Sequence, residues 1–387
     1  MAGFELELYR QETLKWLAGL RSGQGAYRLW SGGVPHLLPT AFAVFLLELF
    51  DALPVCGSAE STAIVEFLLG HRDPDTGLFT HGSSDTPGGR IHDSEYVGMQ
   101  QTHFALQALK ILGMDPLPAL PFMDRWATRD GLEKTLAGLD WNNPWLVSNT
   151  VMFLYGFYRH EADRKGDAPV GTQWIRSWLE ATQRPSGLWG NDAERRVYNA
   201  IYGAFHFLFF WLGEGLAVPR SGSLLELTKT LQTTEGYFAH TRGGGACEDY
   251  DCADLLLKLG AAGGKPVLDR HVARMLQDRN PDGGYCWAKK RPAGPVFLLG
   301  NWKPGLCLTE NRRLLQQRLL DMLGFNRYWY YSGIRDLKCP TGASDIWSTW
   351  FRNLVLAEYD HEFVGSGAGW RFRTFPSMGW HPTKDTR

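Results

Sequence analysis

The sequence has no excess of either charge, few cysteines and no recognisable targeting segment. Its 387 residues include 40 Lys and Arg and 41 Asp and Glu, so no overall field attracts nucleic acid. The six cysteines form no Cys-x-x-Cys pair, which disfavours a disulfide scaffold or a zinc ribbon and fits a reducing compartment. Two glutamates stand where a signal peptide would carry a cationic region. These absences predict a cytoplasmic protein that binds no nucleic acid; they leave a peripheral membrane contact and the oligomeric state open.

The signature motifs of several large enzyme classes are also missing. The chain has no Walker loop, no Gly-x-Gly-x-x-Gly after a strand and no Gly-x-Ser-x-Gly elbow. Its most membrane-like run, residues 199–218, is interrupted by His206 and Glu214, which indicates a buried helix rather than a membrane span. Aromatic residues are abundant instead, with 16 Trp, 14 Tyr and 21 Phe. Many will fill the core, and the remainder suits an apolar cavity with electron-rich walls.

A turn of similar composition recurs along the chain. Gln183 opens the pattern Gln-x-x-x-Gly-x-Trp, and Gln232 opens the same pattern with Phe in place of Trp. A longer version begins at Gln277 and reaches Gly284 and Trp287. Shared offsets of this kind indicate an internal repeat. The predicted turns occupy residues 71–79, 183–190, 232–238 and 277–287, with a degenerate copy near 126–133.

Long apolar segments follow the turns, and amphipathic segments precede them. Residues 94–113 and 196–215 are apolar nearly all round, which predicts buried helices, whereas residues 171–182 have one apolar stripe, which predicts an outer helix. An open stack of such pairs would need polar capping units. Because none is evident, the sequence predicts an all-α fold closed into a ring. We expect a single α/α toroid of about five to six outer/inner helix pairs over residues 1–364, with an irregular tail over 365–387.

These motifs resemble those of a known superfamily. The Gln-x-x-x-Gly-x-Trp turns resemble the QW repeats of the terpenoid cyclases and protein prenyltransferases, whose members are α/α toroids. The segment DYDCADLLLKLG looks like the Asp-x-Asp-Asp-Thr-Ala segment of class II terpene cyclases, with Asp249 at the first aspartate and Asp251 at the second. The resemblance implies that Asp251, kept protonated, is the general acid that starts polyene cyclisation. Cys252 stands at the third aspartate, and the Asp-x-Cys and His zinc ligands of the prenyltransferase β subunit have no counterpart, so no metal site is predicted.

The acidic cluster admits three chemical interpretations. Burial and a neighbouring carboxylate both raise a carboxyl pKa, so Asp251 could be a protonated acid whose pKa is adjusted by Asp249 and Glu248. Alternatively, Asp251 is an ionised helix N-cap, or the three carboxylates hold a divalent metal or a diphosphate. Acid-initiated cyclisation requires no cofactor; Mg²⁺ would enter only with a diphosphate substrate.

Polar and aromatic residues recur near the start of the segments expected to form the inner helices. In a toroid these helix ends converge on one mouth, and buried polar groups are costly unless they pair or face a cavity. We therefore expect a shared substrate site built from several inner helices. Its expected members are His92, Tyr96, His103, Trp141, Trp145, Asn149, Tyr198, Tyr202, His206, Trp347 and Trp350.

The sequence therefore favours a class II terpene cyclase-like enzyme that cyclises a polyprenyl, isoprenoid small molecule in an aromatic cavity. One alternative is a carbohydrate-active toroid, which needs a second carboxylate facing Asp251, such as Asp93, Glu95 or Asp140. The other is a non-catalytic prenyl- or lipid-binding toroid in which Asp251 is an ionised cap.

Overall fold

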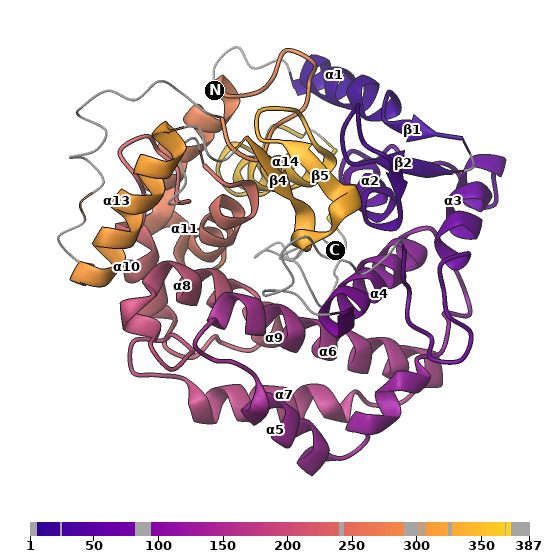
Figure 1. Ribbon diagram of the computed structural model, residues 1–387, viewed down its shortest axis with the longest axis horizontal. Coiled ribbons are helices and arrows are strands. Elements are labelled where there is room, and N and C mark those ends of the chain that lie inside the picture. The colour runs from indigo at the N-terminus through magenta and orange to yellow at the C-terminus, as the bar shows by residue number, and fades with distance from the viewer. Residues whose placement is uncertain are drawn as a thin grey trace.

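The chain folds into an all-α, closed double ring of helices (Figure 1). The computed structural model describes residues 6–23, 25–81, 94–239, 244–289, 302, 306–323, 327–367 and 369–372. Along the inner ring each helix contacts the next, and α14 contacts α2 to close the circle. The inner helices, in chain order, are α2 (Leu37–Leu49), α4 (Ser94–Ile111), α6 (Pro144–Lys165), α8 (Val197–Phe205) with α9 (Phe209–Leu212), the first part of α11 (Ala246–Gln277) and α14 (Ile346–Tyr359).

The outer ring gives each inner helix a preceding partner, which makes six pairs within the described chain and confirms the predicted α/α toroid. The outer helices are α1 (Leu6–Ala18), α3 (Ala59–Leu69), α5 (Arg129–Gly138), α7 (Val170–Thr182), α10 (Ser221–Thr230) and the second part of α11. A further helix, α13 (Leu308–Met322), lies outside this arrangement, beside α10 in Figure 1. None of the helices in the described ranges has the length and apolar character needed to cross a membrane.

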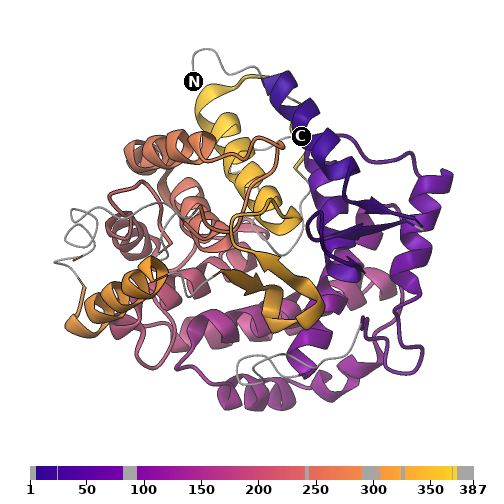
Figure 2. The same ribbon diagram turned by 45° about the horizontal axis from the view of Figure 1, so that its top comes forward.

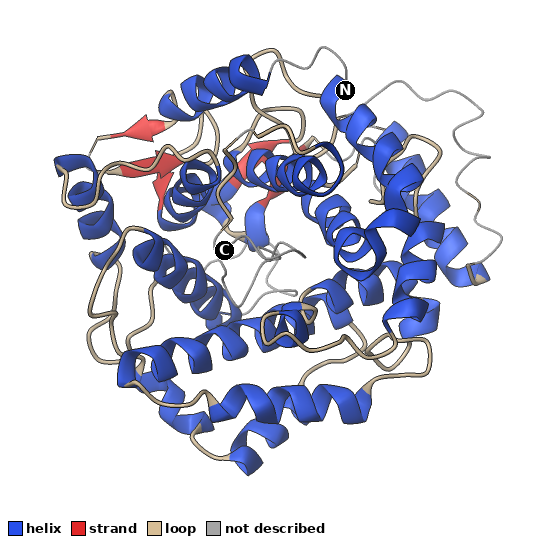
Figure 3. Cartoon of the chain, turned by 180° about the vertical axis from the view of Figure 1, so that it is seen from behind, coloured by secondary structure: helices blue, strands red, loops and turns tan. Residues whose placement is uncertain are grey.

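The inner and outer helices differ in how much of their surface is buried. In α2, a 13-residue helix, every residue except Leu47 is buried, because the helix is apolar on all sides and is surrounded by its ring neighbours. In α5 only Leu132 and Leu136 are buried, which is one stripe facing the inner ring. Seen from behind, helices make up most of the described chain (Figure 3). The hydrophobic pattern of the sequence therefore predicts correctly which helices lie inside.

Strands and short helical turns supply the connections. An antiparallel sheet of β1 (Arg21–Ser22), β2 (Ala26–Arg28) and β3 (Pro35–His36) links α1 to α2. The hairpin of β4 (Tyr328–Tyr330) and β5 (Lys338–Pro340) lies over the central part of the ring (Figures 1 and 2). The remaining short elements are the 3-10 turns Pro121–Trp126, Ala193–Arg195, Tyr331–Gly333 and Arg335–Leu337, and the π-helical turn Asp360–Val364.

The recurrent turns have a common hydrogen-bond geometry. Gln183 Nε2 donates to the carbonyl of Gly187 at 2.9 Å and to that of Pro219 at 3.0 Å. Gln232 Nε2 donates to Gly236 O at 3.1 Å and to Val267 O at 2.7 Å. In each turn the side chain therefore closes its own loop and fastens it to the chain at the next outer helix.

The third turn follows the same geometry in a different register from the one predicted. Arg279, rather than Gln277, donates to Gly283 O at 3.1 Å and to Tyr9 O at 2.9 Å. Gly283, rather than Gly284, has the left-handed conformation, with φ 95° compared with 85° at Gly187. Tyr285 consequently takes the buried aromatic position. The predicted alignment is wrong here because an Arg replaces the Gln at the closing position.

The predicted degenerate copy near residues 126–133 is not a turn of this kind. Gly131 lies in the first turn of α5, where Thr128 is the N-cap and its Oγ1 accepts the Gly131 N–H at 3.2 Å. The sequence WATRDG is therefore a helix start. In the predicted C-terminal tail, Trp370 Nε1 donates to Asp360 Oδ2 at 2.9 Å; most of residues 365–387 lies outside the described residues.

Candidate active site

A cavity of about 360 Å³ lies inside the inner ring, within the size range of small-molecule sites. Its walls come from α4, α6, α11 and α14, and from the chain around β4 that covers the ring opening. Most of the lining is aromatic, and the polar groups are mainly uncharged amides and hydroxyls. The described lining residues are Tyr96, Gln100, Phe104, Asn143, Trp145, Leu146, Asn149, His206, Cys247, Asp251, Trp287, Trp329, Tyr330, Tyr331, Ser332, Trp347 and Phe351.

Asp251 places a carboxyl group on this cavity. The residue is 1% exposed, and burial, followed by the charges of Glu248 and Asp254, raises its pKa well above the usual range. A hydrogen bond from the Trp145 side chain acts in the opposite direction. Oδ2 has no hydrogen-bond partner among the described residues. Burial therefore favours the protonated form of the Asp251 carboxyl, and no described side chain or backbone group satisfies its Oδ2.

The helix-cap interpretation of Asp251 is wrong. Helix α11 begins at Ala246, with Gly245 as its N-cap. Asp251 thus lies in the second turn of the helix, beyond the first backbone N–H groups that a cap would satisfy. Cys247, one turn earlier, lines the cavity on the same side of the helix.

Asp249 has a different environment, although it is only two residues away. Its Oδ1 accepts the backbone N–H groups of Phe238 and Ala239, at 2.7 and 2.9 Å. Its Oδ2 lies 3.2 Å from Nη2 of the buried Arg352 on α14. Asp249 therefore fastens the start of α11 to the preceding turn and to α14. It does not belong to the described lining of the cavity.

Glu248 is a buried carboxyl beside this anchor. Burial and the adjacent Asp249 charge raise the pKa of Glu248 to about 8. The Cys247 thiol lies 3.8 Å from its Oε2. Glu248 is 3% exposed and does not reach the described cavity wall. With this pKa, Glu248 gains its full negative charge, which raises the pKa of Asp251, only above about pH 8.

A buried ion cluster lies deeper along the same stripe of α11. Lys258 pairs with Asp254 and lies 3.2 Å from Glu358 of α14. The Tyr250 hydroxyl donates to Glu358 at 2.9 Å. Burial raises the pKa of Glu358 well above the usual range. Two carboxyl groups thus share one ammonium group below Asp251, and the Asp254 charge contributes to the high pKa of Asp251.

Five of the predicted substrate-binding residues line the cavity: Tyr96, Trp145, Asn149, His206 and Trp347. They come from four inner helices or their ends, as expected for converging entrances. Burial lowers the pKa of His206 to about 3, and its Nδ1 lies 2.8 Å from the Ser148 hydroxyl. His206 is therefore a neutral imidazole at the cavity wall.

Five others lie elsewhere, and His92 is outside the described residues. Trp141 donates its indole N–H to Leu136 O at 2.8 Å, and its ring packs against Trp178 of an outer helix. Tyr198, Tyr202 and Trp350 are fully buried in the core. The prediction that these side chains face the cavity is wrong, because their rings pack between neighbouring helices instead.

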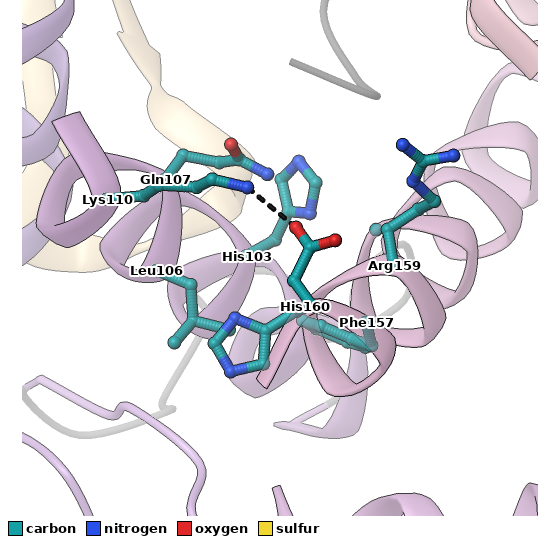
Figure 4. Close-up of a pocket in the computed structure, with 9 residues that line it drawn as sticks. His103, Leu106, Gln107, Lys110, Phe157, Arg159 and His160 are labelled. Atoms are coloured by element: carbon teal, nitrogen blue, oxygen red, sulfur yellow. Dashed lines mark hydrogen bonds and ion pairs between the residues drawn. The ribbon is translucent and has the colours of Figure 1, made fainter. Parts of the chain in front are cut away.

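His103 is the fifth, and it lines a much smaller cavity of about 20 Å³ between α4 and α6 (Figure 4). Burial lowers its pKa to about 3. Beside it, Lys110 and Asp163 form an ion pair of 2.8 Å. This space is about the size of one water molecule, so it is not a substrate site.

One part of the wall, supplied by β4 and the turn that follows it, is not predicted from the sequence. Trp329, Tyr330, Tyr331 and Ser332 all line the cavity, and Trp287 stacks on Trp329 with ring centroids 5.0 Å apart. The available signal was the aromatic run YWYY inside a Gly- and Pro-rich segment. That composition indicated a connection, and only the fold places the connection over the ring opening.

A paired-carboxylate site does not form in the described part of the cavity. Asp251 is the only carboxyl residue among its described lining residues. Glu95 is exposed and pairs with Arg125, Asp140 is exposed and accepts from Asn142, and Asp93 is outside the described residues. Within the described ranges, no group of three or more His, Cys, Asp or Glu side chains is arranged to hold a metal ion.

No family model matches the sequence, and no curated protein matches it. Several solved structures are similar in fold at low identity. One is a variant of type II terpene cyclase MstE from Scytonema in complex with geranylgeranyl dihydroxybenzoate as substrate, which is 16% identical to this chain. The alignment covers 91% of this chain and 97% of that chain, with a TM-score of 0.48. A protein from Actinoplanes is 15% identical with coverage of 91% and 98% and a TM-score of 0.47. A glycosidase variant is 14% identical with coverage of 92% and 98% and a TM-score of 0.48.

Proposed function

We propose that this protein is an acid-initiated polyprenyl cyclase, with Asp251 as the proton donor. The observation that carries the proposal is the buried Asp251 carboxyl on an aromatic cavity of about 360 Å³, with a pKa raised well above the usual range and an Oδ2 that has no partner in the described chain. An alkene is a weak base, so its protonation needs an acid that is held neutral and shielded from water until the substrate arrives. The burial of Asp251 and its raised pKa support this role.

The reaction balances without a cofactor. The π electrons of a terminal double bond take the proton from Asp251, which becomes a carboxylate, and the neighbouring carbon becomes a cation. The next double bonds attack in turn, so that new carbon–carbon bonds close the rings. Loss of a proton from the last cation restores an alkene. Substrate and product are therefore isomers, and one proton enters for each that leaves.

The cavity wall matches the intermediates of this reaction. Aromatic faces attract cations through the ring quadrupole, and Tyr96, Trp145, Trp329 and Trp347 present rings to the cavity. They do not capture a carbocation as a carboxylate or amine would. Gln100 lines the cavity, and its buried Oε1 has no partner in the described chain. The proposed substrate is a polyprenyl chain long enough to fold within this space.

The decisive experiment replaces Asp251 with Asn. Turnover of farnesyl and geranylgeranyl substrates, with free and diphosphate head groups, is measured by product mass spectrometry with and without Mg²⁺. We expect Asp251→Asn to lower turnover by about 100- to 10,000-fold, the usual contribution of a general acid. Asp269→Asn, a half-exposed carboxylate on the same helix, is the control and keeps wild-type turnover.

Deuterium from the solvent provides an independent mechanistic readout. In D₂O the wild-type product should gain one deuterium at the carbon that Asp251 protonates. Full turnover by Asp251→Asn, or a product without solvent deuterium, would contradict the assignment. Release of sugar from a glycoside with no conversion of any prenyl substrate would instead identify the carbohydrate-active alternative.

A further inference from the structure

The helix α13 exposes a face that combines three leucines with one arginine, Arg312. Leu308, Leu319 and Leu323 are 54%, 51% and 63% exposed. The backbone of Leu323 continues the helix, since its N–H bonds to Leu319 O at 3.1 Å. At 3.6 residues per turn, these three leucines fall within about 60° of one another. Arg312 lies between them on the same face, so a basic apolar surface runs along the helix.

The opposite face of α13 already supplies the packing that holds the helix in place. Glu310, Asn311 and Leu314 are 2%, 1% and 4% exposed, and the Asn311 amide donates to Leu306 O at 3.1 Å. The outward-facing leucines are therefore not part of this packed face. The acidic side chain of Glu310 is turned inward, and no described side chain on the exposed face is acidic.

Helix α13 is linked to the cavity wall through Arg313, on the flank of the exposed face. Arg313 Nη1 lies 3.4 Å from Asn199 Oδ1, and Asn199 Nδ2 donates to Asn143 Oδ1 at 3.2 Å. Asn143 lines the cavity, and so does Tyr330 of the β4–β5 hairpin, which is 38% exposed. In Figure 1, α13 and this hairpin both lie on the side of the ring nearer the viewer.

We propose that α13 binds the surface of an anionic lipid membrane and holds the cavity mouth against it. Helices with leucines and arginines on one face lie in the membrane interface, where leucines enter the acyl boundary and arginines contact anionic headgroups. Each basic side chain strengthens binding to an anionic leaflet. A symmetric contact with a second copy is less suited to this face, because it would place Arg312 of each copy in the contact and no described side chain on the face is acidic.

The proposal adds a route for the substrate, a point that rests on the proposed function. A polyprenyl chain is insoluble in water and resides in the bilayer. A docked α13 would let that chain pass from lipid to the cavity without crossing bulk solvent. The lipid contact itself does not depend on whether Asp251 is an acid.

The test is vesicle co-sedimentation of the full chain with phosphatidylcholine vesicles, with and without phosphatidylglycerol. We expect wild type to bind the mixed vesicles, and Leu319→Gln/Leu323→Gln to bind at least about tenfold more weakly, because two apolar side chains no longer enter the acyl region. Arg312→Gln should lose part of the preference for anionic vesicles and become less sensitive to salt. Val55→Gln, at a 78% exposed residue outside α13, is the matched control.

Each outcome decides the proposal. Far-ultraviolet circular dichroism confirms that the variants are folded, which the exposed positions of the leucines lead us to expect. If wild type does not bind vesicles, or if Leu319→Gln/Leu323→Gln binds as wild type does, the proposal is wrong. If wild type is a dimer by light scattering and this variant is a monomer, the face is a self-interface instead. Asp251→Asn should bind vesicles normally, so a failure of the cyclase assignment is distinguished from a failure of the membrane assignment.

Discussion

The buried carboxyl of Glu248 makes folding stability depend on pH with a sign opposite to that of an ordinary paired carboxylate. Its pKa rises from 4.5 to about 8 in the folded chain. Between these values the folded protein keeps the proton and the unfolded chain releases it. Stability contributed by this group therefore falls as pH rises through this window, by about 1.4 kcal/mol per pH unit. Below pH 4 the Glu248 carboxyl is protonated in both states and does not destabilise the folded chain; above pH 9 the loss of stability has reached its full value.

Glu248→Gln removes this titration while preserving side-chain shape. A pKa of about 8 instead of 4.5 corresponds to about 5 kcal/mol above pH 8. The free energy of unfolding of Glu248→Gln, relative to wild type, should therefore increase by up to about 5 kcal/mol between pH 4 and pH 9. The absolute difference at pH 4 reports only the altered hydrogen bonding of the amide.

The measurement is urea unfolding followed by circular dichroism at intervals between pH 4 and pH 9. Urea is uncharged, so it does not screen the charges under study. Glu226→Gln, whose side chain is 72% exposed, is the control, and its effect should stay within about 0.5 kcal/mol at every pH. A difference between Glu248→Gln and wild type that is constant over this range would refute the reasoning. It would mean that water or rearrangement stabilises the Glu248 carboxylate.

The same titration enters the proposed chemistry. Ionisation of Glu248 near pH 8 places a negative charge beside Asp251, and this charge raises the pKa of Asp251. A higher pKa makes Asp251 a weaker acid. We therefore expect turnover to decline above about pH 8 in wild type, and Glu248→Gln should weaken that decline.

Three further predictions follow from individual contacts. Arg352→Gln leaves the Asp249 carboxylate buried without its counter-charge, and we expect it to lower the free energy of unfolding in urea by about 3–5 kcal/mol. The double variant Arg352→Gln/Asp249→Asn should recover much of this loss. Equal stability of the single and double variants would contradict the ion-pair assignment. Gln232→Ala removes two buried hydrogen bonds that link neighbouring outer elements and should cost about 1–3 kcal/mol by the same measurement, whereas an unchanged transition would show that the linkage is dispensable. Gly187→Ala gives a left-handed residue, with φ 85°, a Cβ atom 3.0 Å from a leucine side chain. We expect this substitution to lower the free energy of unfolding by about 1–3 kcal/mol. Gly138→Ala, where the added Cβ meets no atom within 4 Å, is the control and should have little effect.

The sequence is sufficient to predict the ring because the ring follows from local patterns. Helices apolar on all sides must be enclosed, and helices with one stripe must cover them. The first part of α11 and α14 are enclosed in this way, as the sequence predicts. The turn signals are local as well, since the closing side chain and the left-handed glycine are four residues apart in Gln183 and Gly187. At the third turn Arg279 takes the place of Gln, so the Gln-based pattern does not identify the closing residue and the predicted register is wrong.

The separate roles of Asp249 and Asp251 depend on where α11 begins. Two residues apart on a helix, side chains point to nearly opposite sides, so a start at Ala246 sends Asp251 to the cavity and Asp249 to Arg352. The sequence shows that acids are clustered there. It does not show which of them is paired with a cation more than 100 residues away.

The composition and periodicity of this chain determined its helices, its closed ring and the acidic segment at one inner helix. Tertiary structure alone decided which aromatic residues face the cavity and which fill the core. Tyr202 and Trp350 are buried in the core, whereas Trp145 and Trp347 line the cavity, although all four are aromatic residues in apolar inner helices. Tertiary structure also decided that the β4–β5 connection completes the cavity wall. The physical reason is that burial against a neighbour and exposure to a cavity are both favourable for an aromatic ring. Only contacts between distant segments distinguish the two environments.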